Sequence, residues 1–229
     1  MISDDLLTRW TTPPTIDGPF LRPFVCRGHL VHHGVFIAGI NPGTPIYPSD
    51  ISPSEYRKIL RSTEQFEPAY SAIRSKRGES ADGRTRLGLR SLSNWFLAEG
   101  VKGLLETNVV PYPTRKARQL KNISIEHQSH WVFREVCETF RPKLIVLHGK
   151  PSRDKFIDYV APKSLQWAKN VSMEELENRS EPLMVGKWSD NEPYFVFVCR
   201  HLMYYGICGD SYLPFRNAIK SYLTLDDHS

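Results

Sequence analysis

Cysteines and long apolar runs are both scarce in this sequence. Four cysteines are scattered along the 229 residues, and no two of them form a C-x-x-C pair. This argues against a disulfide framework and against a cysteine-based zinc or iron–sulfur centre. No apolar run approaches the length of a membrane-spanning helix, and the first residues, with Asp4 and Asp5, lack the pattern of a secretory signal. We therefore expect a cytoplasmic protein that does not contact membranes.

A strong charge of one sign and a metal-ligand cluster are also missing. Lys and Arg number 30 against 25 Asp and Glu, which gives a net charge of +5. This balance favours a polyanionic partner without requiring one. His127 and His130 are close enough to share a helix face, but no constellation of cysteines or carboxylates supports them. The sequence therefore predicts neither a metal site nor another cofactor.

Short apolar runs typical of buried β-strands occur in four places. Helical patterns separate these runs, which are Val35 to Ala38, Leu104 to Val110, Leu144 to Leu147 and Tyr194 to Val198. Parallel strands need crossover connections, and helices supply them. We therefore predict an α/β fold: a three-layer α/β/α arrangement with a central four-stranded parallel sheet.

The remaining segments set the predicted domain boundaries. Residues 1–33 hold four prolines, which oppose regular helix, so we expect an extended N-terminal arm. Residues 34–225 form one predicted domain, which closes with an amphipathic helix around Phe215 and Ile219. Residues 71–90 are rich in arginine and loosened by glycines, so they predict a mobile basic loop inserted in that domain.

Amides, imidazole and backbone groups stand at the carboxyl ends of the predicted strands, where parallel sheets bind ligands. Neither residues 39–43 nor Gly149-Lys150 fits a dinucleotide-binding or P-loop pattern. The strand ends also offer no obvious cysteine or serine nucleophile and no carboxylate pair, which makes them poorly suited to covalent catalysis. They suit a reaction in which the leaving group departs readily and a positioned water attacks, such as hydrolysis of a pyrimidine N-glycoside.

The residues at these strand ends resemble the motifs of the uracil-DNA glycosylase superfamily. Residues 35–43, which end in G-I-N-P-G, are similar to the first motif of the mismatch-specific uracil- and thymine-DNA glycosylase branch. Residues 105–111 resemble the family's strand that ends in a base-reading asparagine, and residues 145–149 resemble its third strand. Residues 198–203 stand in the place of the last motif, usually H-P-S or N-P-S, but the proline and serine are missing. The resemblance spans about residues 35 to 223 and implies a divergent member with the family's fold.

This resemblance implies a role for each polar side chain at the strand ends. Asn41 would hold the attacking water, and Asn108 would pair with the Watson–Crick edge of a base flipped out of DNA. His201 would donate a hydrogen bond to the base carbonyl that gains charge as the bond breaks. Plainer interpretations stay open: a turn residue for Asn41, a strand-end cap for Asn108 and a structural histidine for His201.

The same resemblance implies contacts to the base and to DNA around these three residues. Tyr47 would stack on the base, with Phe66 and Tyr70 as more distant candidates. The backbone close to the base would come from Gly39, Ile40, Pro42 and Gly43. A wedge that fills the gap in the duplex is expected among Leu202, Met203, Tyr204 and Tyr205. Phosphate contacts are expected from Lys150, Arg153 and Arg115.

Together these expectations indicate a monofunctional DNA glycosylase that hydrolyses the N-glycosidic bond of a damaged or modified pyrimidine and leaves an abasic site. A monomer bound to DNA is expected, and in a bacterium it would be associated with the nucleoid. Two alternatives stay open: a catalytically inactive nucleic-acid-binding protein of the same fold, and a hydrolase of free nucleosides or nucleotides. The sequence does not distinguish uracil, mismatched thymine and modified cytosine as the base.

Overall fold

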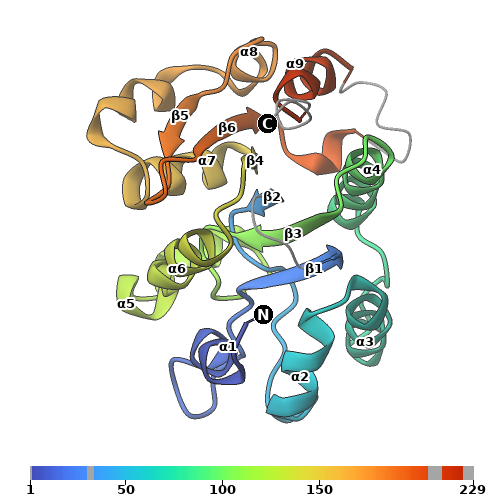
Figure 1. Cartoon of the computed structure of the whole chain (residues 1–229). Helices are drawn as coiled ribbons and strands as arrows, with labels where there is room; N and C mark the ends of the chain where they lie inside the picture. The colour runs from blue at the N-terminus through green and yellow to red at the C-terminus, as the bar shows by residue number, and fades with distance from the viewer. Residues whose placement is uncertain (1, 30–33, 206–212, 224–229) are drawn as a thin grey trace.

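A six-stranded mixed β-sheet forms the centre of the molecule (Figure 1). The computed structural model describes residues 2–29, 34–205 and 213–223. The strands lie in the order β1-β3-β2-β4-β6-β5. Their bounds are β1 Phe24–Gly28, β2 Val35–Gly39, β3 Gly103–Asn108, β4 Leu144–His148, β5 Met184–Lys187 and β6 Pro193–Cys199. The α/β class predicted from the sequence is confirmed.

The four strands that the sequence predicts are β2, β3, β4 and β6, which are neighbours in the middle of the sheet. They pair in parallel, whereas β1 and β5 add antiparallel strands at the two edges. The four predicted strands are thus present and parallel, but the sheet is mixed and has six strands rather than the predicted four. Both edge strands have weak patterns, because β1 directly follows a proline-rich stretch and β5 is short, half-exposed and interrupted by Gly186.

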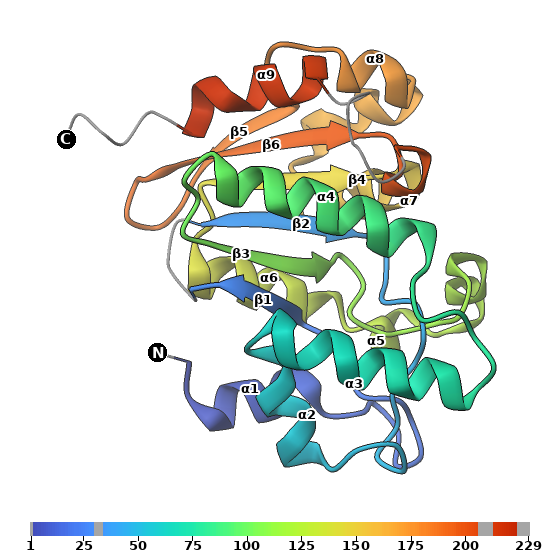
Figure 2. The ribbon, with the colours of Figure 1, turned by 90° about the vertical axis from the view of Figure 1, so that its right-hand side faces the viewer.

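The central strands are apolar throughout because helices cover both faces of the sheet. In β2, Val35 and Ile37 pack with α4 (Arg84–Ala98) and α9 (Leu213–Leu223) on one face. Successive side chains of a strand point to opposite faces, so a strand covered on both sides has no polar face. Figure 2 shows α4 lying across the strands on this side.

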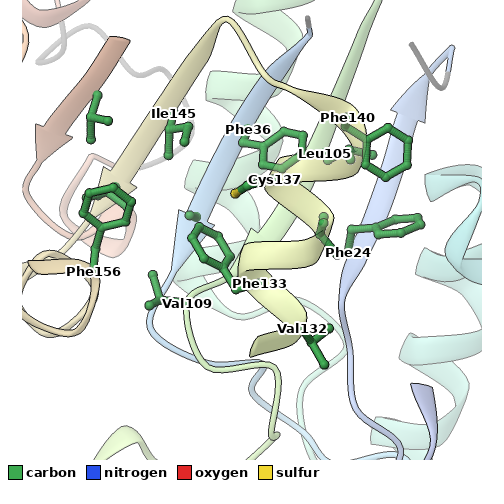
Figure 3. Close-up of a cluster of buried hydrophobic side chains, with 14 of the residues drawn as sticks. Phe24, Phe36, Leu105, Val109, Val132, Phe133, Cys137, Phe140, Ile145 and Phe156 are labelled. Carbon is green, nitrogen blue, oxygen red and sulfur yellow. The ribbon is translucent and has the colours of Figure 1, made fainter. Parts of the chain in front are cut away.

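The opposite face carries the larger apolar cluster, to which α1 (Asp4–Thr11), α6 (His130–Phe140) and α7 (Lys150–Tyr159) contribute. Figure 3 shows Phe133 and Phe140 of α6 beside the strand residues that point to them. The remaining helices are α2 Pro53–Leu60, α3 Thr63–Lys76, α5 Ile125–Gln128 and α8 Met173–Glu177, with 3-10 helices at Ala117–Asn122, Lys163–Asn170 and Leu202–Tyr204.

Residues 2–29 do not form the predicted extended arm. Ser3 caps α1, whose Leu7 and Trp10 are buried, and the edge strand β1 follows. Only residues 12–23 of the described part of this segment form a long stretch without helix or strand, and all four prolines lie there. Proline therefore prevents regular structure only locally, and the prediction extended its effect too far.

The predicted mobile basic loop at residues 71–90 is largely helical. α3 continues to Lys76 and α4 begins at Arg84, so the connection between them is short. Ile73 and Leu89 are buried, while the charged residues between them occupy exposed or half-exposed positions. α2 and α3 share a third apolar cluster with the segment before β1, and this packing brings α3 to the cavity described below.

Among the described residues, no helix is long and apolar enough to cross a membrane. Cys26, Cys137 and Cys199 are buried free thiols. Cys208 and the predicted domain end at residue 225 lie outside the described residues.

Candidate functional site

A cavity of about 320 Å³ opens at the carboxyl ends of β2, β3 and β4. This is the edge at which parallel sheets bind ligands. Three side chains that the sequence singles out, Asn41, Asn108 and His201, line the same cavity. The backbone predicted to surround a base also lines it, at Gly39, Ile40, Pro42 and Gly43. These segments therefore meet at one cavity, while their chemical roles stay predictions.

The amide of Asn41 has its orientation set by two acceptors. Its Nδ2 donates to Thr114 Oγ1 at 2.8 Å and to the Pro42 carbonyl at 3.0 Å. Thr114 Oγ1 donates in turn to the Lys116 carbonyl at 3.0 Å, so it accepts from Asn41. Since carbonyl oxygens only accept, the NH2 end of the amide must face these groups. The Oδ1 atom of Asn41 is therefore the acceptor at the other end of the amide.

Gly39 makes room for two neighbouring side chains at the end of β2. A Cβ atom at this position would lie 2.9 Å from His148 Nε2 and 3.0 Å from Asn108 Oδ1. Gly39 is paired with Asn108 in register, and β4 with His148 at its end lies on the other side of β2. Any larger residue at position 39 would push these two side chains away from the strand end.

His148 is a site residue whose role the sequence does not indicate. It lines the cavity, it is buried, and its Nδ1 has no hydrogen-bond partner. Burial, with a smaller contribution from His201, lowers the pKa of His148 to about 3, so the ring is neutral. A polar residue at the end of an otherwise apolar strand is the feature of the sequence that could have identified His148.

Acidification is expected to destabilise the protein through His148. The unfolded chain binds a proton there near the ordinary pKa of 6.5, whereas the folded state resists protonation down to about 3. The unfolded state thus binds more protons in this window, so stability falls as the pH falls, by up to about 1.4 kcal/mol per pH unit. We expect His148→Asn to flatten the wild-type slope between about pH 6.5 and about pH 4.5 in urea unfolding. Parallel slopes for the two proteins would contradict a buried neutral ring.

His201 follows β6 and faces His148, with the two ring centroids 5.1 Å apart. Its Nδ1 accepts from the Met203 backbone N–H at 3.3 Å, which places the proton of the neutral ring on Nε2. Burial lowers the pKa of His201. A Cβ atom at Gly149, which has a φ of +87°, would lie 3.0 Å from His201 Cδ2, so this glycine provides space for the ring. His201 is thus a neutral donor through Nε2.

The four residues after His201 divide into two buried and two exposed side chains. Leu202 and Tyr205 are buried, and the Leu202 backbone lies against Gly88 of α4. Their burial makes them unsuited to act as a wedge, which narrows the predicted wedge to the other two residues. Met203 and Tyr204 are 39% and 72% exposed and remain candidates.

Glu177, at the end of α8, holds both ends of this loop. Its carboxylate accepts from the Arg200 backbone N–H at 2.7 Å, from Arg200 Nη2 at 3.0 Å and from the Tyr205 hydroxyl. Glu177 is buried, and these donors offset the cost of placing its charge there. His201 lies between the two residues that Glu177 binds.

Removal of this carboxylate is expected to cost about 2–3 kcal/mol of unfolding free energy, because Glu177→Ala leaves the Tyr205 hydroxyl and the Arg200 N–H without their acceptor. Glu174→Ala, on the exposed side of the same helix, is the matched control and should stay within about 0.5 kcal/mol of wild type. Chemical denaturation measures both. Equal stability of the two variants would contradict the anchoring role.

The aromatic residue at the cavity is Tyr70 of α3, which the sequence offers only as a more distant candidate. Tyr70 lines the cavity, and its hydroxyl accepts from the Thr44 N–H at 3.3 Å. Tyr47, the predicted stacking residue, is not part of the cavity wall, and the Arg77 guanidinium lies 5.7 Å from its ring centroid. The prediction for Tyr47 is wrong because its neighbour Ile46 packs against Phe20, away from the cavity wall, whereas the packing of α3 places Tyr70 there.

The three predicted phosphate contacts differ in exposure. Arg153 is fully buried and donates to the carbonyls of Val171 at 2.7 Å and Lys169 at 3.1 Å, so it is a structural residue and that prediction is wrong. Lys150 is exposed at the start of α7, and Arg115 is exposed at the rim of the cavity.

The arginines of residues 71–90 are mostly paired. Their ion pairs are Arg74–Glu79 at 3.1 Å, Arg77–Asp50 at 2.5 Å, Arg90–Glu67 at 3.3 Å and Arg86–Glu106. Lys76 and Arg84 are exposed. Most of the charge that suggested a basic loop is therefore neutralised within the protein.

In the part of the chain that the structure describes, no group of three or more His, Cys, Asp or Glu side chains is arranged to hold a metal ion. Comparisons with protein-family models and with curated protein sequences found no match.

Proposed function

We propose that the chain is a DNA glycosylase of the uracil-DNA glycosylase type, which flips a damaged or modified pyrimidine out of DNA and hydrolyses its bond to the sugar. One observation carries the proposal: Asn41, Asn108 and His201 come from three different strand ends and line one cavity. Helices on both faces of the sheet agree with the three-layer arrangement that the resemblance implies.

Each of the three side chains supplies one function that the reaction needs. Asn41 Oδ1 accepts a hydrogen bond from a water and directs it at the anomeric carbon. The Asn108 carboxamide pairs with the polar edge of the base. His201 donates from Nε2 to the base carbonyl, which gains charge as the C1′–N1 bond breaks and its electron pair goes to the base. The attacking water loses a proton, and the released base gains one.

The exposed residues around the cavity fit the remaining steps. Met203 or Tyr204 fills the gap that the flipped nucleotide leaves, and Lys150 and Arg115 contact phosphates. The protein acts as a monomer on DNA in the cytoplasm, or at the nucleoid in a bacterium. Attack by water rather than by an amine makes the enzyme monofunctional.

A hydrolase of free nucleotides is the second candidate, because four arginines line the cavity and favour an anionic ligand.

A screen separates the two functions. Duplexes and single strands with uracil, mismatched thymine or modified cytosine are incubated with the protein beside free nucleosides and nucleotides, and abasic sites are detected by alkali cleavage. We expect abasic sites in at least one modified strand. Binding of every strand without abasic sites would overturn the proposed reaction.

A further inference from the structure

The charges that line the cavity are strongly unbalanced. Four arginines and one carboxylate contribute to its wall: Arg22, Arg74, Arg86, Arg115 and Glu106. Arg86 pairs with Glu106, while Arg74 and Arg115 both approach Glu79, at 3.1 Å and 3.8 Å. Two carboxylates therefore serve three of the arginines, and the structure gives no ion pair for the fourth, Arg22, within the described residues.

Arg22 is a buried cation with few polar contacts. The residue is 4% exposed, its Nη2 donates to the Thr44 carbonyl at 3.0 Å, the Tyr56 side chain interacts with it, and its Nε has no hydrogen-bond partner. The guanidinium carbon lies 5.0 Å from the ring centroids of both Phe66 and Tyr70. An unpaired charge in such a place is costly, and a bound anion would offset that cost.

Tyr70 lies next to Arg22, and the charge of Arg22 lowers its pKa. Its hydroxyl oxygen already accepts from the Thr44 N–H, so its own proton is available to an acceptor in the cavity. Burial alone would raise the pKa of Tyr70, but Arg22, the Thr44 hydrogen bond, Arg86 and Arg74 lower it to about 8. The local potential at this hydroxyl is therefore strongly positive, which is the condition that favours an anion.

We propose that Arg22 and Tyr70, with the nearby charge of Arg86, form an anion subsite in the cavity that binds a carboxylate or phosphate group of the substrate. The inference rests on the proposed function in one respect, since it assigns that group to the flipped nucleotide. The substrate class becomes a pyrimidine that carries an acidic substituent, with the nucleotide phosphate as the other source of the same chemistry.

Calorimetric titration of the protein with small molecules tests the subsite without DNA. The probes form two matched pairs: uracil against 5-carboxyuracil, and deoxyuridine against deoxyuridine monophosphate. We expect one acid to bind wild type at least about tenfold more tightly than its neutral partner, because charge-assisted hydrogen bonds are strong. A gain in the first pair identifies an acidic base, and a gain only in the second identifies the phosphate.

Two variants test which residues cause this gain in affinity for the acid over its neutral partner. Arg22→Met removes the charge at similar volume and should abolish the gain, and Tyr70→Phe should reduce it; Arg22→Met should also fold, because an unpaired buried charge does not stabilise the native state. The control, Arg134→Met, changes an exposed arginine on α6 that is not part of this cavity. No gain in wild type, or an equal gain in Arg22→Met, would overturn the subsite. The titration measures binding and does not depend on base excision. If wild type binds the acid more tightly but excises no base in the separate screen, only the glycosylase reaction is refuted.

Discussion

Asn41→Ala is expected to lower the single-turnover rate of base excision by about 10²- to 10³-fold with little change in DNA affinity. The variant removes Oδ1, the atom that the contacts to Thr114 and Pro42 leave for the attacking water. The Asn41 side chain is half-buried, so the lost hydrogen bonds should cost only about 1 kcal/mol of stability.

Two further variants sharpen this test. Asn41→Asp keeps an acceptor at the position of Oδ1 and should retain more activity than Asn41→Ala. Asn170→Ala, an exposed asparagine away from the cavity, should behave as wild type. An Asn41→Ala rate within about threefold of wild type would show that the side chain does not act in the chemical step.

His201→Leu is expected to lower the excision rate by about 10²- to 10³-fold, because it removes one donor to the developing negative charge of the leaving base. The effect should fall on the rate of the bound complex rather than on binding, since the donor matters most in the transition state. His127→Leu, a half-exposed histidine on α5, is the matched control. Unchanged single-turnover rates in His201→Leu would contradict the assignment.

The pH dependence adds an independent check on His201. Burial lowers its pKa below the ordinary 6.5, so the neutral ring dominates above that value and donates through Nε2. The wild-type rate should therefore be flat from about pH 6.5 to about pH 7, below the pKa of about 8 of Tyr70 in the same cavity. A rate that increases steadily as the pH falls through this range would mean that a charged histidine is the donor.

The middle of the fold is predictable from the sequence, and its edges are not. β2, β3, β4 and β6 are covered on both faces. Each therefore appears in the sequence as an unbroken run of apolar residues, which predicts a buried strand. β1 and β5 lie at the edges, where strands are short and partly exposed and leave little pattern. The sequence pattern assigns the end of α3 and the first turns of α4 to a basic loop, because the exposed sides of these segments carry most of the arginines.

The candidate site divides in a similar way. Asn41, Asn108 and His201 are found from the sequence because parallel strands bring their carboxyl ends to one edge. Arg22 and Tyr70 come from segments whose positions depend on packing between α3 and the chain before β1, which no local pattern encodes. Arg153 shows the opposite failure, since sequence does not separate an arginine that caps buried carbonyls from one that meets phosphate.

The reaction that we propose for this cavity is hydrolysis of the N-glycosidic bond of a nucleotide in DNA. Mass spectrometry of intact oligonucleotides tests it most directly, with wild type and Asn41→Ala compared on the same modified strand. Wild type is expected to release the free base and leave an unbroken strand whose mass falls by that of the free base and rises by that of one water, while Asn41→Ala leaves most of the strand unchanged. Strands that are bound by wild type but keep their full mass, or release of base at the same rate by both proteins, would contradict it.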